Sequence, residues 1–152
     1  MFGQDGKKRA ILCDLDGTLC DISHRFPLFQ AGKQKEFEAE VLNDSSDKMV
    51  GSFLNFARFR GYEIVFLSAR SEDLRNVTQA WLAEHFPGFE RFPVFLKGRK
   101  DFRADDQIKR EIYNTEVKPR YDVALVLEDR SSVVSMWREL GLKCWQVAAG
   151  DY

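Results

Sequence analysis

The sequence predicts an α/β fold, namely a Rossmann-like three-layer sandwich with a central parallel sheet of five strands. Two observations predict it: five short apolar runs are distributed along the chain, and helical patterns separate them. Strand and helix alternate at the spacing of β-α-β units, which implies right-handed crossovers and helices on both faces of the sheet. With 152 residues, of which 44% are hydrophobic and 31% charged, residues 1–152 have the size and composition of one domain.

The five predicted strands are nearly continuous apolar runs of the kind that lie buried between two layers of helices. They cover residues 9–13, 63–67, 93–96, 123–127 and 143–147. These runs are too short to cross a bilayer, and the first residues contain no apolar region like that of a signal peptide. We therefore expect a cytoplasmic protein without a membrane partner.

Four helices are predicted from apolar residues spaced three, four and seven positions apart. The first pattern begins after Asp47, which can cap its amino end, and ends at Gly61. The others have apolar residues at positions 74, 77 and 81, at 108 and 112, and at 133, 137 and 140. Trp81, Trp137 and Trp145 follow the helical or strand periodicity, so we expect them in the core rather than as base-stacking residues.

The first crossover is longer than a single helix and two loops require, because about forty residues separate Gly17 from the second predicted strand. Residues 20–46 are therefore predicted to be an insert, with one short helix near residues 35–42. The insert follows the first strand, where it can form a small cap above the end of the sheet.

Charge and cysteine content exclude several classes of protein. The chain has 23 Lys and Arg against 24 Asp and Glu, a net charge of −1, so it is not a polycation that binds nucleic acid nonspecifically. Cys13, Cys20 and Cys144 are odd in number and form no C-x-x-C pair, so neither a disulfide framework nor a zinc site is indicated.

Two carboxylates follow the first strand, in the string ILCDLDGTL. Asp14 and Asp16 are two residues apart, so both side chains can reach the crevice at the carboxyl edge of the sheet. Two close carboxylates repel each other unless one binds a proton or a cation lies between them. Mg²⁺ prefers such oxygen ligands, and Asp129, next to Glu128, follows the fourth strand and should reach the same edge.

These residues resemble the haloacid dehalogenase-like phosphohydrolase superfamily. The order of its motifs is D-x-D-G-T, then Ser or Thr after the second strand, then Lys, then an acidic pair, and this sequence contains all four in that order. The resemblance implies a role for each matching residue: Asp14 the nucleophile, Asp16 the general acid and base, Ser68 the phosphate-binding hydroxyl, Lys109 the charge-stabilising lysine, and Glu128 with Asp129 the metal-binding acids.

A narrower resemblance covers nearly the whole chain. DISHR, LSARSE, RADDQIKREI and the closing LEDRSSVVSMWRELGLKCWQVAAGDY are similar to the phosphatase domain of bacteriophage polynucleotide kinases. That resemblance implies Mg²⁺-dependent removal of 3′-phosphates from DNA or RNA ends, a separate kinase or ligase as a partner, and, for a phage protein, the cytoplasm of the host. The sequence departs from the pattern in having Glu128-Asp129 where Asp-Asp is usual. It also lacks the G-x-x-x-x-G-K-[ST] loop, so we do not expect kinase activity.

The expected mechanism has two half-reactions. Asp14 attacks the phosphorus and forms a phosphoaspartate. Asp16, if it is protonated beforehand, can donate to the leaving oxygen and later take a proton from the hydrolytic water. Asp14 and Asp129 ligate Mg²⁺ through side chains and Asp16 through its backbone carbonyl, as the resemblance implies. Ser68 and Lys109 hold the non-bridging oxygens.

Cations are expected to contact the rest of the substrate. Arg25 and Arg70 lie within motifs like those of the family, so we predict substrate contact for both. Asp105 has two interpretations, because it can orient an arginine or cap the next helix. The loop after the third strand also contains four cations, which form either a basic rim for a phosphodiester or a solvated surface: Lys97, Arg99, Lys100 and Arg103.

Two other functions compete with polynucleotide 3′-phosphatase. The first is a nucleotide or other small-molecule phosphatase with the same catalytic residues, which a small cap disfavours because enclosure of a small ligand needs more covering structure. The second is a noncatalytic nucleic-acid-binding module, which the intact acids and Lys109 disfavour. The sequence leaves open the preference for DNA or RNA and the oligomeric state.

Overall fold

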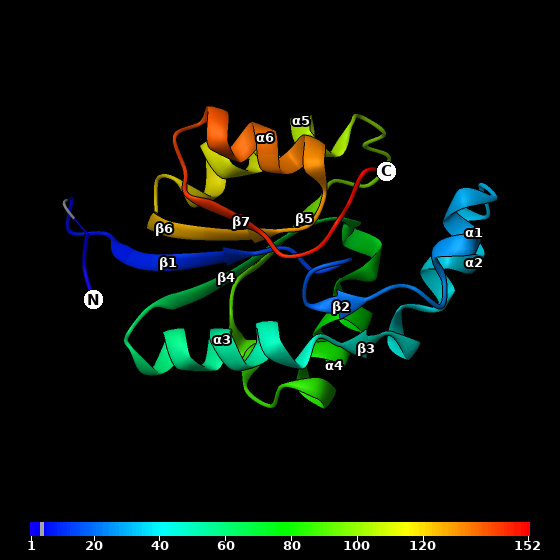
Figure 1. Cartoon of the computed structure of the whole chain (residues 1–152), viewed down its shortest axis with the longest axis horizontal. Coiled ribbons are helices and arrows are strands. Elements are labelled where there is room, and N and C mark those ends of the chain that lie inside the picture. Colours follow the sequence, from blue (N-terminus) through cyan, green and yellow to red (C-terminus); the bar gives the residue numbers. More distant parts are fainter. Residues whose placement is uncertain (4) are drawn as a thin grey trace.

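The computed structural model describes residues 1–3 and 5–152, and its centre is a parallel five-stranded sheet (Figure 1). The strands are arranged in the order β5-β4-β1-β6-β7, so the chain begins near the middle of the sheet and later strands are added on both sides. The bounds are β1 Lys8–Cys13, β4 Glu63–Ser71, β5 Val94–Lys97, β6 Tyr121–Glu128 and β7 Cys144–Gln146. The predicted five-stranded parallel sheet is thus confirmed.

Two layers of helices cover the sheet, with α3 and α4 on one face and α5 and α6 on the other (Figure 1). The helices are α1 Phe26–Gln30, α2 Gln34–Ala39, α3 Lys48–Phe59, α4 Arg75–His85, α5 Asp105–Ile112 and α6 Ser131–Glu139. A π-helical segment, Tyr113–Val117, continues α5. The Asp47 carboxylate caps α3 by accepting hydrogen bonds from the N–H groups of Met49 (2.9 Å) and Val50 (3.0 Å), as its sequence position predicted.

The core consists of one apolar cluster on each face, because successive residues of a buried strand point to opposite sides. Ile11 and Phe66 lie in the cluster beneath α3 and α4, whereas Leu12 and Val65 lie in the cluster beneath α6. Trp81 is fully buried in the first cluster and Trp137 in the second, which confirms their assignment to the core. All three cysteines are free and buried.

The assignment of Trp145 to the core is wrong, because its side chain is 51% exposed. Trp145 lies on β7, the edge strand of the sheet, and alternates with the buried Cys144. At the edge of the sheet no further strand lies beside the ring on one side, so periodicity alone does not bury it. The indole instead packs against Phe53 of α3, with 5.5 Å between the ring centroids.

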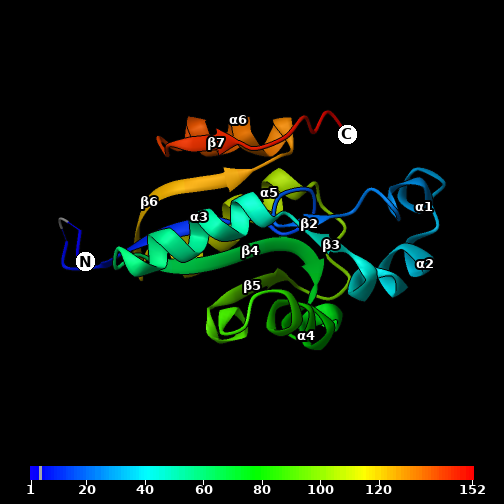
Figure 2. The ribbon, with the colours of Figure 1, turned by 60° about the horizontal axis from the view of Figure 1, so that its bottom comes forward.

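Residues 20–46 form a separate small structure at the carboxyl ends of the strands. They begin and end in a two-stranded antiparallel ladder, β2 Cys20–Asp21 with β3 Ser45–Ser46, and α1, α2 and a 3₁₀ turn at Val41–Asn43 lie between. Figure 2 shows α1 and α2 projecting beyond the end of the sheet. The helix predicted near residues 35–42 corresponds to α2, but the prediction that the insert has only one helix is wrong. A second helix, α1, has Pro27 in its first turn, and Gly32, with a φ of 70°, separates the two.

Among the described residues, the structure has no helix long and apolar enough to span a membrane.

Candidate active site

The candidate site is assembled where β1, β4 and β6 end. Asp14 directly follows β1, and its N–H donates to the Leu127 carbonyl (3.1 Å), which holds it beside the end of β6. Glu128 is the last residue of β6, and Asp129 follows it. Parallel strands end at one edge of a sheet, so residues 114 positions apart in sequence meet there.

Lys109 links two of these acids from α5. Its Nζ donates to Asp14 Oδ1 (2.9 Å) and to Glu128 Oε2 (2.7 Å), and the three side chains are almost completely buried. Burial alone would lower the pKa of Lys109, but the charges of Asp14 and Glu128 raise it above its ordinary value, so Lys109 is a cation. Glu128 Oε1 also accepts the N–H groups of Asp129 and Arg130. Glu128 and Asp14 together thus hold the Lys109 ammonium group at the strand ends.

The acid cluster carries more negative charge than Lys109 neutralises. Burial raises the pKa of Asp14 to about 8, and the charge of Glu128 adds to the effect. Burial and the charge of Asp14 likewise raise the pKa of Asp129. Oxygens of Asp14, Glu128 and Asp129 lie within 4.8 Å of one another. A buried set of carboxylate oxygens with unbalanced charge suits a hard divalent cation such as Mg²⁺.

Small and hydroxylated neighbours surround Asp129. A Cβ atom on Gly17, whose φ is 83°, would lie only 2.2 Å from Asp129 Oδ2, so the D-x-D-G-T turn needs glycine at this position. Thr18 Oγ1 donates to Asp129 Oδ1 (3.3 Å), and the Tyr152 hydroxyl donates to Oδ2 (2.6 Å). The contact from Tyr152 is not evident from the sequence, because it brings the last described residue back to the acidic pair, 23 positions earlier.

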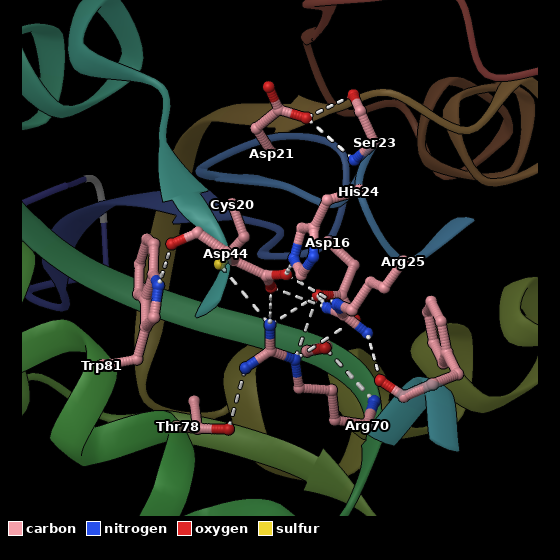
Figure 3. Close-up of polar contacts among 12 residues, drawn as sticks. Asp16, Cys20, Asp21, Ser23, His24, Arg25, Asp44, Arg70, Thr78 and Trp81 are labelled. Carbon is pink, nitrogen blue, oxygen red and sulfur yellow. Dashed lines mark hydrogen bonds and ion pairs between the residues drawn. The ribbon is translucent and has the colours of Figure 1, made fainter. Parts of the chain in front are cut away.

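The Asp16 side chain lies outside this acid cluster, among arginines (Figure 3). Its Oδ1 accepts hydrogen bonds from Arg25 Nη2 (2.7 Å) and Arg70 Nη2 (2.5 Å). Burial alone would raise the pKa of Asp16, but the charges of Arg70 and Arg25 lower it below its ordinary value. Asp16 is therefore ionised in this arrangement. A proton on Asp16 before the attack, the condition for its role as general acid, is not met in this arrangement, because two cations stabilise the carboxylate.

Asp44, which the sequence analysis missed, holds these arginines in place (Figure 3). The Asp44 residue is only 1% exposed. Its Oδ1 accepts a hydrogen bond from Arg25 Nε (2.6 Å), and its Oδ2 accepts hydrogen bonds from Arg25 Nη2 (2.7 Å) and Arg70 Nη2 (3.4 Å). The Asp44 backbone carbonyl is fixed in turn by Trp81 Nε1 (2.8 Å). Asp44 lies at the end of the insert in an unremarkable NDSS string, so only the folded insert shows its place.

Ser68 lies in β4, close to the arginine cluster. It is 1% exposed, and its Oγ accepts the N–H of Arg70 (3.2 Å). Arg70 itself donates to Thr78 on α4 (3.0 Å) as well as to the acids. Ser68, Arg25 and Arg70 all line the same pocket as Asp14 and Lys109, so the structure brings the predicted catalytic residues together.

The predicted rim residues differ in their surroundings. Lys97, Lys100, Arg103 and Asp105 line the pocket, whereas Arg99 is not among its lining residues and pairs with the exposed Asp73 (2.6 Å). Arg103 is paired with Asp101 (2.7 Å) and Glu111 (2.6 Å). Asp105 lies in the first turn of α5 and pairs with Arg130, so the structure favours the interpretation in which it orients an arginine.

The pocket itself is a cleft of about 630 Å³ between the acid cluster and the insert. Its floor is made by the residues at the strand ends, and one wall by aromatic residues of the insert and Tyr152. Phe26 packs against Tyr152 with ring centroids 5.2 Å apart, and Arg130 lies over the same tyrosine ring at 4.7 Å. No pattern in the sequence indicates this aromatic wall, which forms only when the insert folds over the end of the sheet.

The fold and the site together define the class of protein: a phosphatase of the haloacid dehalogenase type. The family model for the polynucleotide kinase PNKP phosphatase domain matches residues 8–152, and the chain belongs to this family. The superfamily and the narrower resemblance inferred from the motifs are thus confirmed.

Individual relatives agree with this membership. A protein of Autographa californica nuclear polyhedrosis virus, named as a bifunctional polynucleotide kinase/RNA ligase, is 29% identical over 145 residues, or 95% of this chain and 20% of the viral protein. A solved Pnkp1/Rnl/Hen1 RNA repair complex contains a chain that is 31% identical, with a TM-score of 0.85 over 100% of this chain and 46% of its own length. The class C acid phosphatase of Bacillus anthracis, 22% identical, shares the fold with a TM-score of 0.61 over 81% of this chain and 52% of its own. The chain thus spans only part of each of these relatives.

Proposed function

We propose that this chain removes 3′-phosphates from the ends of DNA or RNA, with Mg²⁺, through a phosphoaspartate on Asp14. The observation that carries the proposal is the Asp14 carboxylate, held by Lys109 beside Asp129 on the floor of an open cleft. Family membership supports the reaction class. The cations at the mouth of the cleft support a substrate with further phosphates.

The chemistry follows from the positions of the side chains. Asp14 and Asp129 would hold Mg²⁺, which when bound would supply positive charge for the approach of a doubly anionic phosphomonoester to the Asp14 carboxylate. An oxygen of Asp14 forms a bond to phosphorus as the bond to the 3′-oxygen breaks, and Asp16 donates a proton to that oxygen. Water then attacks the phosphoaspartate, Asp16 takes its proton, and Asp14 is released. Ser68 and Lys109 hold the non-bridging oxygens during both steps.

In this proposal, substrate binding allows Asp16 to take up the proton that it needs as a general acid. In the structure Arg25 and Arg70 pair with Asp16 and Asp44. A substrate phosphate is a competing anion for both arginines, and its charge beside Asp16 favours the protonated carboxyl. The role predicted for Arg25 and Arg70 as substrate contacts is therefore compatible with their being fully paired in this structure.

The insert and the relatives support a polymer as substrate. Residues 20–46 act in this proposal as a small cap that lines one side of the cleft and leaves a mouth through which a strand end can enter. The relatives named for polynucleotide kinase, RNA ligase and RNA repair support a pathway of end repair. We accordingly propose that a kinase and a ligase act together with this phosphatase.

The test compares a 3′-phosphorylated oligonucleotide with nucleoside 3′- and 5′-monophosphates, each with Mg²⁺, and uses Asp14→Asn as the control for contaminating phosphatase. The expected result is a kcat/KM at least about tenfold higher on the oligonucleotide, since only this substrate reaches the rim cations. Equal or higher kcat/KM on the mononucleotides would refute the polynucleotide specificity and favour a nucleotide phosphatase.

A further inference from the structure

An aromatic side chain is exposed to solvent at the mouth of the cleft. Phe102, in the loop between β5 and α5, is 88% exposed and lines the same pocket as Asp14. A large apolar ring that faces water at the edge of a catalytic cleft is more informative than one on a remote surface, because it offers a contact to whatever enters the cleft.

The loop holds this ring in a defined place. The N–H of Asp101 donates to the Gly98 carbonyl (3.3 Å), which closes a turn, and Lys100 within the turn has a φ of 59°. After Phe102 the chain is fixed again, because Arg103 Nε donates to Asp101 (3.0 Å) and Arg103 Nη1 donates to Glu111 on α5 (2.6 Å). Hydrogen bonds thus fix both neighbours of Phe102. Because the loop is already ordered, little conformational entropy is lost when a ligand stacks on the ring.

Two ammonium groups accompany the ring. Lys97 and Lys100 line the pocket, and in the described part of the chain neither forms a salt bridge, whereas Arg99 and Arg103 are both paired with acids. An exposed aromatic face next to unpaired cations is the combination that binds single-stranded nucleic acid: a base stacks on the ring and the backbone phosphates lie beside the cations.

We propose that Phe102 is a stacking platform for a base near the 3′ end of the strand whose terminal phosphate reacts at Asp14, and that this contact sets the preference for nucleic acid over other phosphomonoesters. The inference rests on the proposed polynucleotide 3′-phosphatase function and deepens it. Phe102 is a specificity residue in this proposal and takes no part in the chemical step.

The test measures kcat/KM for Phe102→Ala, Phe102→Leu and Phe102→Trp. The matched control is Phe59→Ala, because Phe59 is 86% exposed but lies on α3 and does not line the pocket. Base–aromatic stacking contributes about 1–3 kcal/mol per base, so Phe102→Ala should lower kcat/KM on a 3′-phosphorylated oligonucleotide by about 5- to 150-fold. Phe102→Trp should retain the wild-type kcat/KM on the oligonucleotide. Phe102→Leu should lower it as Phe102→Ala does, since Leu is apolar but has no π face.

Substrates that lack a base identify the contact. Oligonucleotides with an abasic residue at the last, penultimate or third position from the 3′ end are compared with the complete strand. At the position that stacks on Phe102, the abasic substrate should lower wild-type kcat/KM to the value of Phe102→Ala and should not lower the variant further. A simple alkyl phosphate should be hydrolysed equally by wild type and by all variants.

The outcomes separate this inference from the function on which it rests. If wild type hydrolyses the alkyl phosphate but shows no preference for the oligonucleotide, the proposed function fails. If wild type prefers the oligonucleotide and Phe102→Ala behaves like Phe59→Ala, the function stands and the stacking role is overturned. Full activity of Phe102→Leu, or an abasic effect that is the same with and without Phe102, would also overturn it.

Discussion

Removing the charge of Asp14 should stabilise the protein while it abolishes turnover. The folded protein raises the pKa of this carboxyl from 3.8 to about 8, so ionised Asp14 is strained in the cluster with Glu128 and Asp129. Each pKa unit corresponds to about 1.4 kcal/mol, which gives a cost of about 5 kcal/mol at pH 8. The pKa of about 8 already includes the favourable contact with Lys109. Burying the amide of Asn in place of the carboxyl costs up to about 3 kcal/mol of the gain. We therefore expect a net stabilisation of at least about 2 kcal/mol.

The stability difference between Asp14→Asn and wild type should depend on pH in a definite direction. Between the unfolded pKa of 3.8 and the folded pKa of about 8 the folded protein binds the proton more tightly than the unfolded chain, so this group lowers wild-type stability as pH rises. The advantage of Asp14→Asn should therefore be absent near pH 4, grow toward pH 8 and stay constant above it. For a domain of this size about 2 kcal/mol corresponds to a rise in Tm of roughly 4–8 °C.

The assay is thermal unfolding in excess chelator at several values of pH, with Asp73→Asn as the control, because Asp73 is a well-exposed partner of Arg99. Adding Mg²⁺ should stabilise wild type more than the variant and so reduce the difference. A variant less stable than wild type at pH 8, or an advantage of equal size at pH 4 and pH 8, would refute charge strain in the acid cluster.

Three further outcomes are expected. Asp44→Asn should lower the free energy of unfolding by about 3 kcal/mol in urea, because it removes one of the two carboxylates that neutralise the buried Arg25 and Arg70, whereas Asp73→Asn should cost less than about 1 kcal/mol; equal losses would contradict this role of Asp44. Asp16→Asn should reduce the rate on an alkyl phosphate much more than on an aryl phosphate with a good leaving group, and equal reductions would argue against proton donation. Chelation should stop turnover and leave the helical circular dichroism signal unchanged, since the metal ligands lie on a complete core; loss of that signal would show that the metal is structural.

Local chemistry made much of the fold and the centre of the site predictable. The parallel sheet could be inferred because buried strands are continuously apolar and the helices between them have their own periodicity. Asp14, Asp16, Ser68, Lys109 and Asp129 could be selected because each follows or lies near the carboxyl end of a predicted strand, or within a motif of characteristic order. Parallel strands end at a common edge, so the sequence alone placed these side chains around one cleft.

Other features depended on contacts between distant segments. The partial exposure of Trp145 follows from its place on the edge strand, which periodicity does not reveal. The division of the insert into α1 and α2 depended on one glycine with a positive φ and on how the insert packs. Asp44 became visible as the hub of the arginines only after β2 and β3 paired and brought the end of the insert back to Asp16.

The sequence by itself determined the fold class, the order of the strands along the chain and the choice of candidate reacting groups, because these depend on periodicity and on short motifs. Only the tertiary structure decided their ionisation and their partners. It placed Glu128 on Lys109, clamped Asp16 between Arg25 and Arg70, and left Phe102 in solvent at the mouth of the cleft. The physical reason is that burial and Coulomb interactions depend on distances in space, which side chains far apart in sequence acquire only when the chain is folded.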